Sequence, residues 1–99
     1  MVEEINDARF EEVINNKKVL VDCYATWCGP CRMLSPIIDE LAEEITDYSF
    51  YKLDVDNSKE VTKEYGIMSI PTLLIFEDGK LKEKIVGFIP KDELADKLK

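Results

Sequence analysis

Two cysteines, Cys28 and Cys31, are the residues of this sequence best suited to chemistry. They stand between an apolar segment that we expect to be a strand and an amphipathic segment that we expect to be a helix. At the start of a helix, unpaired backbone N–H groups and the positive end of the helix dipole favour the thiolate form of Cys28. A thiolate is the nucleophile of disulfide exchange.

The spacing of the pair suits a two-step exchange. Cys31 lies three residues after Cys28, so we expect it on the same helical face, within reach of Cys28 and nearer the core. Between them, Gly29 lets the backbone turn close to the sulfur, and Pro30 presets a helical φ in the first turn. Cys31 can therefore resolve a bond that Cys28 has formed.

Two other interpretations of the pair remain open. It could be half of a zinc site, but zinc takes four ligands, the chain has no His, and Cys23 and carboxylates are the only other candidates. It could also be an inert disulfide, although so short a loop constrains the unfolded chain little. The position between strand and helix favours a redox pair, and we expect no metal.

Chain length, net charge and the lack of long apolar runs exclude several classes of function. Ninety-nine residues predict one domain, residues 1–99, and a net charge of -8 from 13 basic and 21 acidic residues argues against nucleic acid and anionic membranes as partners. The acidic residues near Met1 do not resemble a secretory signal, and the longest apolar run, residues 73–76, is far shorter than the roughly 20 residues of a membrane helix. We therefore expect a cytoplasmic protein, unless a signal was removed.

Hydrophobic periodicity predicts alternating strands and helices. We expect an α/β fold with the order β-α-β-α-β-α-β-β-α, a central mixed sheet with helices on both faces. Asn57 or Ser58 can cap the third helix, and Gly66 can end it. The expected strands are residues 2–5, 19–25, 50–55, 72–76 and 81–86, and the expected helices are residues 7–14, 31–45, 58–65 and 90–98.

Eight short segments keep the order found in one known family. They are Val21-Asp22, Ala25-Thr26-Trp27-Cys28-Gly29-Pro30-Cys31, Pro36, Lys52-Leu53-Asp54-Val55-Asp56, Tyr65-Gly66-Ile67, Ile70-Pro71-Thr72, Asp78-Gly79 and Val86-Gly87. On these segments, which span nearly the whole chain, the protein resembles the thioredoxins, small proteins that reduce disulfides. The resemblance implies the thioredoxin fold and reduction of protein disulfides at Cys28 and Cys31, which would form a disulfide when oxidised.

The resemblance also implies partners. A thioredoxin reductase would recycle the oxidised pair, and the chain itself, which has no Gly-x-Gly-x-x-Gly motif, would need no cofactor. We expect a monomer. A disulfide oxidant or isomerase of the same fold is the nearest rival, and a redox-responsive binding subunit is the rival from another class.

An acid and a lysine are assigned to the site by the resemblance. Asp22 would lie beneath the cysteines and accept the proton of Cys31, and Lys52 would modulate its proton affinity. The residue pattern alone instead favours Asp22 as an acid at a sheet edge facing water. An ordinary exposed lysine is an equally good interpretation of Lys52.

A substrate platform is assigned in the same way. X-Pro statistics favour a trans bond at Pro71, whereas the family has a cis proline there, beside the cysteines. The Ile70 backbone would pair with an extended substrate segment. Packing alone can explain Trp27, and a helix stop can explain Gly66. The residues assigned to the platform are Trp27, Gly29, Pro30, Gly66, Ile70, Pro71, Gly87 and Phe88.

Cys23 departs from the family pattern, which usually has a large aromatic residue there. Successive strand residues face opposite sides, so Cys23 should point away from Asp22 and from the redox pair. We interpret it as a buried, inert residue, with a second redox site as the alternative. The acidic runs, among them residues 54–56, are interpreted as solvated faces.

Overall fold

A computed structural model describes residues 2–99; Met1, the first residue of the expected domain, lies outside the described residues. The predicted order of elements is confirmed, with a 3-10 turn, η1, added after the third strand. The elements are β1 (Glu3–Ile5), α1 (Asp7–Ile14), β2 (Lys18–Tyr24), α2 (Gly29–Glu44), β3 (Ser49–Asp54), η1 (Val55–Asn57), α3 (Lys59–Glu64), β4 (Thr72–Glu77), β5 (Lys80–Val86) and α4 (Lys91–Lys97).

The five strands form one mixed sheet in the order β1-β3-β2-β4-β5. β1, β3 and β2 run parallel, and β4 and β5 are antiparallel to their neighbours. β2, which leads into the cysteine motif, is therefore the central strand. None of the helices formed by residues 2–99 is long and apolar enough to cross a membrane.

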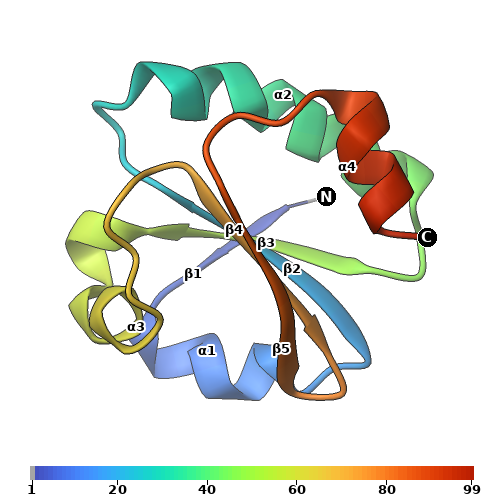
Figure 1. The fold of residues 1–99 in the computed structure, drawn as a ribbon. Coiled ribbons are helices and arrows are strands. Elements are labelled where there is room, and N and C mark those ends of the chain that lie inside the picture. The colour runs from blue at the N-terminus through green and yellow to red at the C-terminus, as the bar shows by residue number, and fades with distance from the viewer. Residues whose placement is uncertain (1) are drawn as a thin grey trace.

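Helices cover both faces of the sheet, with α1 and α3 below it and α2 and α4 above it in Figure 1. Side chains along β2 alternate between the two faces of the sheet. Val21 and Cys23 pack into the apolar cluster beneath α1 and α3, and Leu20 packs into the cluster beneath α2 and α4. Asp22 has the parity of Leu20. Its side chain therefore belongs to the face covered by α2.

Local sequence explains most element ends. Asn6 caps α1, accepting a hydrogen bond from the amide of Ala8 at 3.0 Å. The β4–β5 turn has positive φ at Asp78 and Gly79, +52° and +82°, which the Asp-Gly pair supplies as predicted. Val55, expected in the third strand, begins η1 instead, and Pro90 precedes α4 as its N-cap.

The start of α3 differs from the prediction. Ser58 occupies the N-cap position, but within residues 2–99 its side chain makes no capping hydrogen bond. The carboxylate of Asp7, at the start of α1, instead accepts hydrogen bonds from the backbone amides of Glu60 at 3.2 Å and Val61 at 3.0 Å. One carboxylate thus caps a helix more than fifty residues away and ties α1 to α3.

Replacing Asp7 should therefore destabilise the whole domain. Asp7→Ala leaves two helix amides without their acceptor and should lower the free energy of unfolding by about 1 to 2 kcal/mol. Asp7→Asn should lose less, because an amide oxygen still accepts a hydrogen bond. Denaturant unfolding measures both, with Glu43→Ala on the exposed side of α2 as the matched control. Equal effects at the two positions would contradict the capping role.

Candidate active site

The two motif cysteines form a disulfide at the start of α2, with their Cα atoms 5.3 Å apart. Cys28 is the N-cap of the helix, and its Sγ accepts a hydrogen bond from the amide of Cys31 at 3.2 Å. That amide is one of the donors that a helix cannot satisfy internally. The helix start therefore directs a donor at Cys28 Sγ, as the sequence predicts.

The two sulfurs have different surroundings. Cys28 Sγ lies 3.8 Å from the backbone oxygen of Ile70, in the segment that leads into the cis Ile70–Pro71 bond. Cys31 lines a cavity of about 230 Å³ on the other side of the pair. Whole-residue exposure, 5% for Cys28 and 4% for Cys31, does not rank them. What separates them is which neighbours each one faces.

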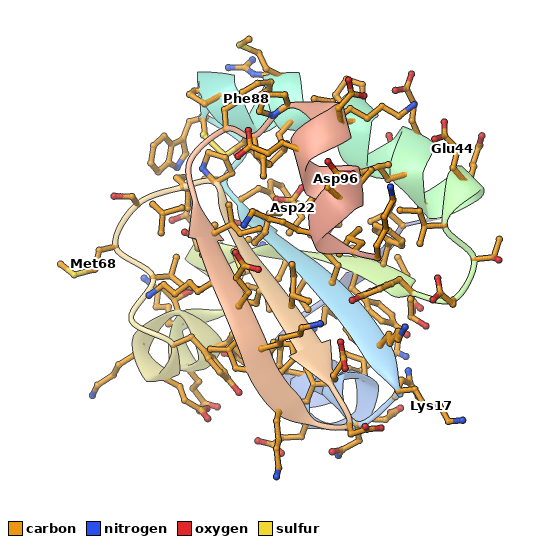
Figure 2. The ribbon with its side chains drawn as sticks, turned by 45° about the vertical axis from the view of Figure 1, so that its right-hand side comes forward. Lys17, Asp22, Glu44, Met68, Phe88 and Asp96 are labelled. Atoms are coloured by element: carbon orange, nitrogen blue, oxygen red, sulfur yellow. A yellow bond between two sulfur atoms is a disulfide. The ribbon has the colours of Figure 1, made fainter. Side chains whose placement is uncertain are left out.

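Asp22 lies inside the molecule, between the sheet and α2 (Figure 2). It is 5% exposed, and its Oδ1 has no hydrogen-bond partner among residues 2–99. The water-facing acid favoured by the residue pattern alone is therefore wrong, because β2 is central rather than an edge. Burial raises the pKa of Asp22 to about 7, the charge of Lys52 opposes that rise, and Asp39 adds to it.

One cavity joins the acid, the lysine and the second cysteine. Lys52 is the register partner of Asp22 on β3 and half-buried, so the interpretation as an ordinary exposed lysine is wrong. Because Asp22 and Cys31 line the same small space, the carboxylate is suited to exchange a proton with the reduced Cys31 thiol. The lining residues are Asp22, Tyr24, Ala25, Thr26, Cys31, Arg32, Ser35 and Lys52.

Several platform residues gather on the Cys28 side. The amide of Gly87 donates to the carbonyl of Pro71 at 2.8 Å, which joins the β5 end to the cis-proline segment. Trp27 and Phe88 are large apolar side chains left 67% and 45% exposed, and Ile70 packs against the cysteines. Pro30 is exposed, and Gly29 has open space where a side chain would begin.

Gly66 has a φ of +60° at the end of α3, which fits the helix stop. The Nζ of Lys84 donates to the carbonyls of Tyr65 at 2.9 Å and Gly66 at 3.1 Å. Across the described chain, no hydrogen bond joins Gly66 to the cysteine pair. Its place in the substrate platform therefore stays a prediction.

Asp56 is a site neighbour that the sequence interpretation missed. Its carboxylate accepts a hydrogen bond from Trp27 Nε1 at 2.8 Å, and Asp54 Oδ1 accepts one from the Asp56 amide at 2.9 Å. Asp54 is buried, so the interpretation of residues 54–56 as a solvated face is wrong for Asp54, whereas Asp56 is exposed. Tyr24, two residues after Asp22 on one strand, could have been found from strand alternation.

Cys23 is free and fully buried, on the opposite face of the sheet from Asp22. Burial is the main cause that raises the pKa of its thiol, and the nearby charge of Asp22 adds to the rise. Both causes suppress the thiolate, which is the reactive form. The prediction of a buried cysteine that faces away from the redox pair is confirmed.

The Cys-Gly-Pro-Cys motif lies at a helix start in a mixed α/β fold, with a cis proline beside it and a buried acid below it. These features define the class of dithiol–disulfide exchange proteins. The thioredoxin family model matches residues 1–99. The thioredoxin of Mycoplasmoides gallisepticum is 50% identical over 95 residues, covering 95% of each chain, and that of Listeria monocytogenes is 50% identical over 97 residues, covering 97% of this chain and 94% of its own.

A solved Plasmodium falciparum thioredoxin, 32% identical, superposes with a TM-score of 0.91 over 98% of this chain and 96% of its own. The chain belongs to the thioredoxin family. It is a thiol–disulfide oxidoreductase of the protein-disulfide reductase type, with Cys28 and Cys31 as its redox-active pair.

The raised pKa of Asp22 gives a pH-dependent stability. An acid whose folded pKa, about 7, exceeds its unfolded value of about 3.9 stabilises the fold below the unfolded value, and this contribution is lost as pH rises toward 7. Asp22→Asn should therefore stabilise the protein increasingly above about pH 4, levelling off above about pH 7, with an upper limit of about 4 kcal/mol.

Denaturant unfolding of the oxidised proteins across this range tests the expectation. Glu43→Gln is the matched control, because it neutralises an exposed acid of α2 that does not act on Asp22. An Asp22→Asn advantage that does not change with pH would show that Asp22 titrates as an ordinary surface acid.

The burial of Cys23 predicts its reactivity. In the reduced native protein, an alkylating reagent near neutral pH should modify Cys28 rapidly and leave Cys23 unmodified until the protein is unfolded. Peptide mapping by mass spectrometry after timed alkylation gives both rates. Rapid native labelling of Cys23 would make it a second reactive site and would contradict the inert interpretation.

Proposed function

We propose that this protein carries electrons to protein disulfides in the cytoplasm as a monomer, is re-reduced by a thioredoxin reductase, and so maintains the redox state of cellular thiols. The single observation that supports the division of labour is the different surroundings of the two sulfurs. Cys28 Sγ faces the Ile70 carbonyl, and Cys31 faces the cavity of Asp22. Each cysteine is therefore suited to one half of an exchange.

In the first half, the Cys28 thiolate attacks one sulfur of a substrate disulfide. A mixed disulfide forms between Cys28 and the substrate, and the other substrate sulfur leaves as a thiolate. The amide of Cys31, which donates to Cys28 Sγ at 3.2 Å, also favours the attacking thiolate. Since the helix start supplies this donor, the step needs no charged side chain next to Cys28.

In the second half, Cys31 resolves the mixed disulfide. Asp22 accepts the Cys31 proton, and the new thiolate attacks Cys28 Sγ, closing the Cys28–Cys31 bond and releasing the second substrate thiolate. The substrate gains two electrons and the cysteine pair loses two. An acid with a pKa of about 7 suits this exchange because it is neither fully charged nor fully neutral near that pH.

Substrates dock on the side of Cys28 that faces Ile70. An extended segment pairs with the Ile70 backbone, a contact that reads main chain more than side chains. The exposed rings of Trp27 and Phe88 give apolar contact area on this side. Pro71, Gly29, Pro30, Gly66 and Gly87 complete the proposed platform, which suits a protein that acts on many disulfides.

A partner protein must reduce the oxidised Cys28–Cys31 pair again after each exchange. No Gly-x-Gly-x-x-Gly motif for a nucleotide is present in the sequence, so a thioredoxin reductase supplies the electrons under this proposal. A reductant also needs a compartment in which its thiols stay reduced, which favours the cytoplasm. The reduction potential of the Cys28–Cys31 pair, measured against glutathione, separates a reductant from a disulfide oxidant of the same fold.

Serine variants test the roles of the cysteines. Cys28→Ser should abolish reduction of a generic protein disulfide, while Cys31→Ser should accumulate a covalent mixed disulfide because no resolving thiol remains. Non-reducing electrophoresis and mass spectrometry show the trapped adduct. Cys23→Ala, which removes the third thiol, should trap nothing and keep turnover. Trapping by Cys28→Ser in place of Cys31→Ser would reverse the assignment.

A further inference from the structure

A row of charged residues crosses three strands beside the redox site. Glu4 on β1 is the register partner of Lys52 on β3, and Lys52 is the register partner of Asp22 on β2. Register partners in a sheet present their side chains to the same face. Lys52 therefore stands between two carboxylates, the exposed Glu4 and the buried Asp22.

Tyr24 links Glu4 to the cavity that holds Asp22. Its hydroxyl donates to Glu4 Oε2 at 2.8 Å, although β3 separates the two strands. Tyr24 also lines the cavity that holds Asp22, Lys52 and Cys31. Burial and the bond to Glu4 raise the pKa of Tyr24, so its hydroxyl remains a donor at physiological pH.

We propose that Glu4 is a positioning residue of the disulfide-exchange site, which holds Tyr24 against the Asp22 cavity and keeps a second negative charge on the Asp22 side of the sheet. This role rests on the proposed function of Asp22 as proton acceptor for Cys31. Glu4 touches neither cysteine, and it acts through Tyr24, which lines the cavity that also holds Asp22 and Cys31. The first strand is therefore part of the redox machinery.

The charges that face Asp22 fix the direction of the effect. Lys52 faces it from β3, Asp39, Arg32 and the Cys31 thiol face it from α2, and its β4 partner Leu73 is apolar. Glu4 adds a negative charge two strand spacings away, about 10 Å. Removing that charge favours the charged form of Asp22, so the pH midpoint of mixed-disulfide resolution should fall by about half a unit.

Single-turnover kinetics test the role. A chromogenic aromatic thiol is attached to Cys28 as a mixed disulfide, and its release by Cys31 is followed from about pH 5 to pH 9, on either side of the Asp22 pKa of about 7. Glu4→Gln should lower the midpoint by about half a unit. Glu3→Gln removes the same charge from the opposite face of β1 and should leave the midpoint in place.

The tyrosine contact is tested by a double-variant cycle. In a Tyr24→Phe background, where no hydroxyl holds Glu4, the Glu4→Gln shift should shrink to half or less. An equal shift in both backgrounds, or an equal shift from Glu3→Gln, would overturn the positioning role.

The Asp22→Asn variant separates the role of Asp22 from that of Glu4. A release profile that Asp22→Asn leaves unchanged would remove the proton-acceptor function of Asp22, and the role of Glu4 would fall with it. A profile that depends on Asp22 but does not move with Glu4→Gln would remove only the role of Glu4.

Discussion

Burial of one carboxylate in the central strand is the constraint on which the redox site depends. Asp22 lies between β3 and β4 in the sheet and is covered by α2, with one oxygen lacking a hydrogen-bond partner among residues 2–99. An acid in such a place titrates near neutrality, because its charged form is poorly solvated. Burial of this carboxylate costs folding free energy, and the two apolar clusters on either side of the sheet offset that cost. Under the proposed function, this carboxylate exchanges a proton with Cys31.

The helix α2 brings the cysteine pair next to this buried acid. Its start places Cys28 at the N-cap, where a backbone amide meets the sulfur, and its first turn aims Cys31 into the Asp22 cavity. The segment before β4 brings the Ile70 carbonyl to the other side of Cys28. Strand, helix and cis-proline segment therefore give the two sulfurs different neighbours, although only two residues separate them. This asymmetry is what a two-step exchange requires.

Local patterns were enough to predict the element order, the redox pair and the opposite facing of Asp22 and Cys23, because strand alternation and helix starts are local properties. The place of Asp22 beneath the cysteines was expected only from the family resemblance, because nothing in the residue pattern shows that β2 is the central strand. Contacts between distant segments were not predictable in this way. Asp7 caps α3, and Asp56 accepts a hydrogen bond from Trp27. In both cases the partners lie far apart in the sequence, so residue spacing gives no sign of the contact. The cis bond at Pro71 runs against the ordinary preference of X-Pro bonds, and it was expected only from the family resemblance.

A direct titration of the Asp22 carboxyl group tests this account most sharply. Carbon-13 NMR of protein labelled at aspartate carboxyl carbons follows each acid separately, and the Asp22→Asn variant identifies the resonance. The structure predicts one aspartate in the oxidised protein that titrates with a pKa of about 7 and is missing from the variant. A spectrum in which every aspartate titrates near its ordinary value of about 3.9 would show that the fold does not hold Asp22 in its neutral form.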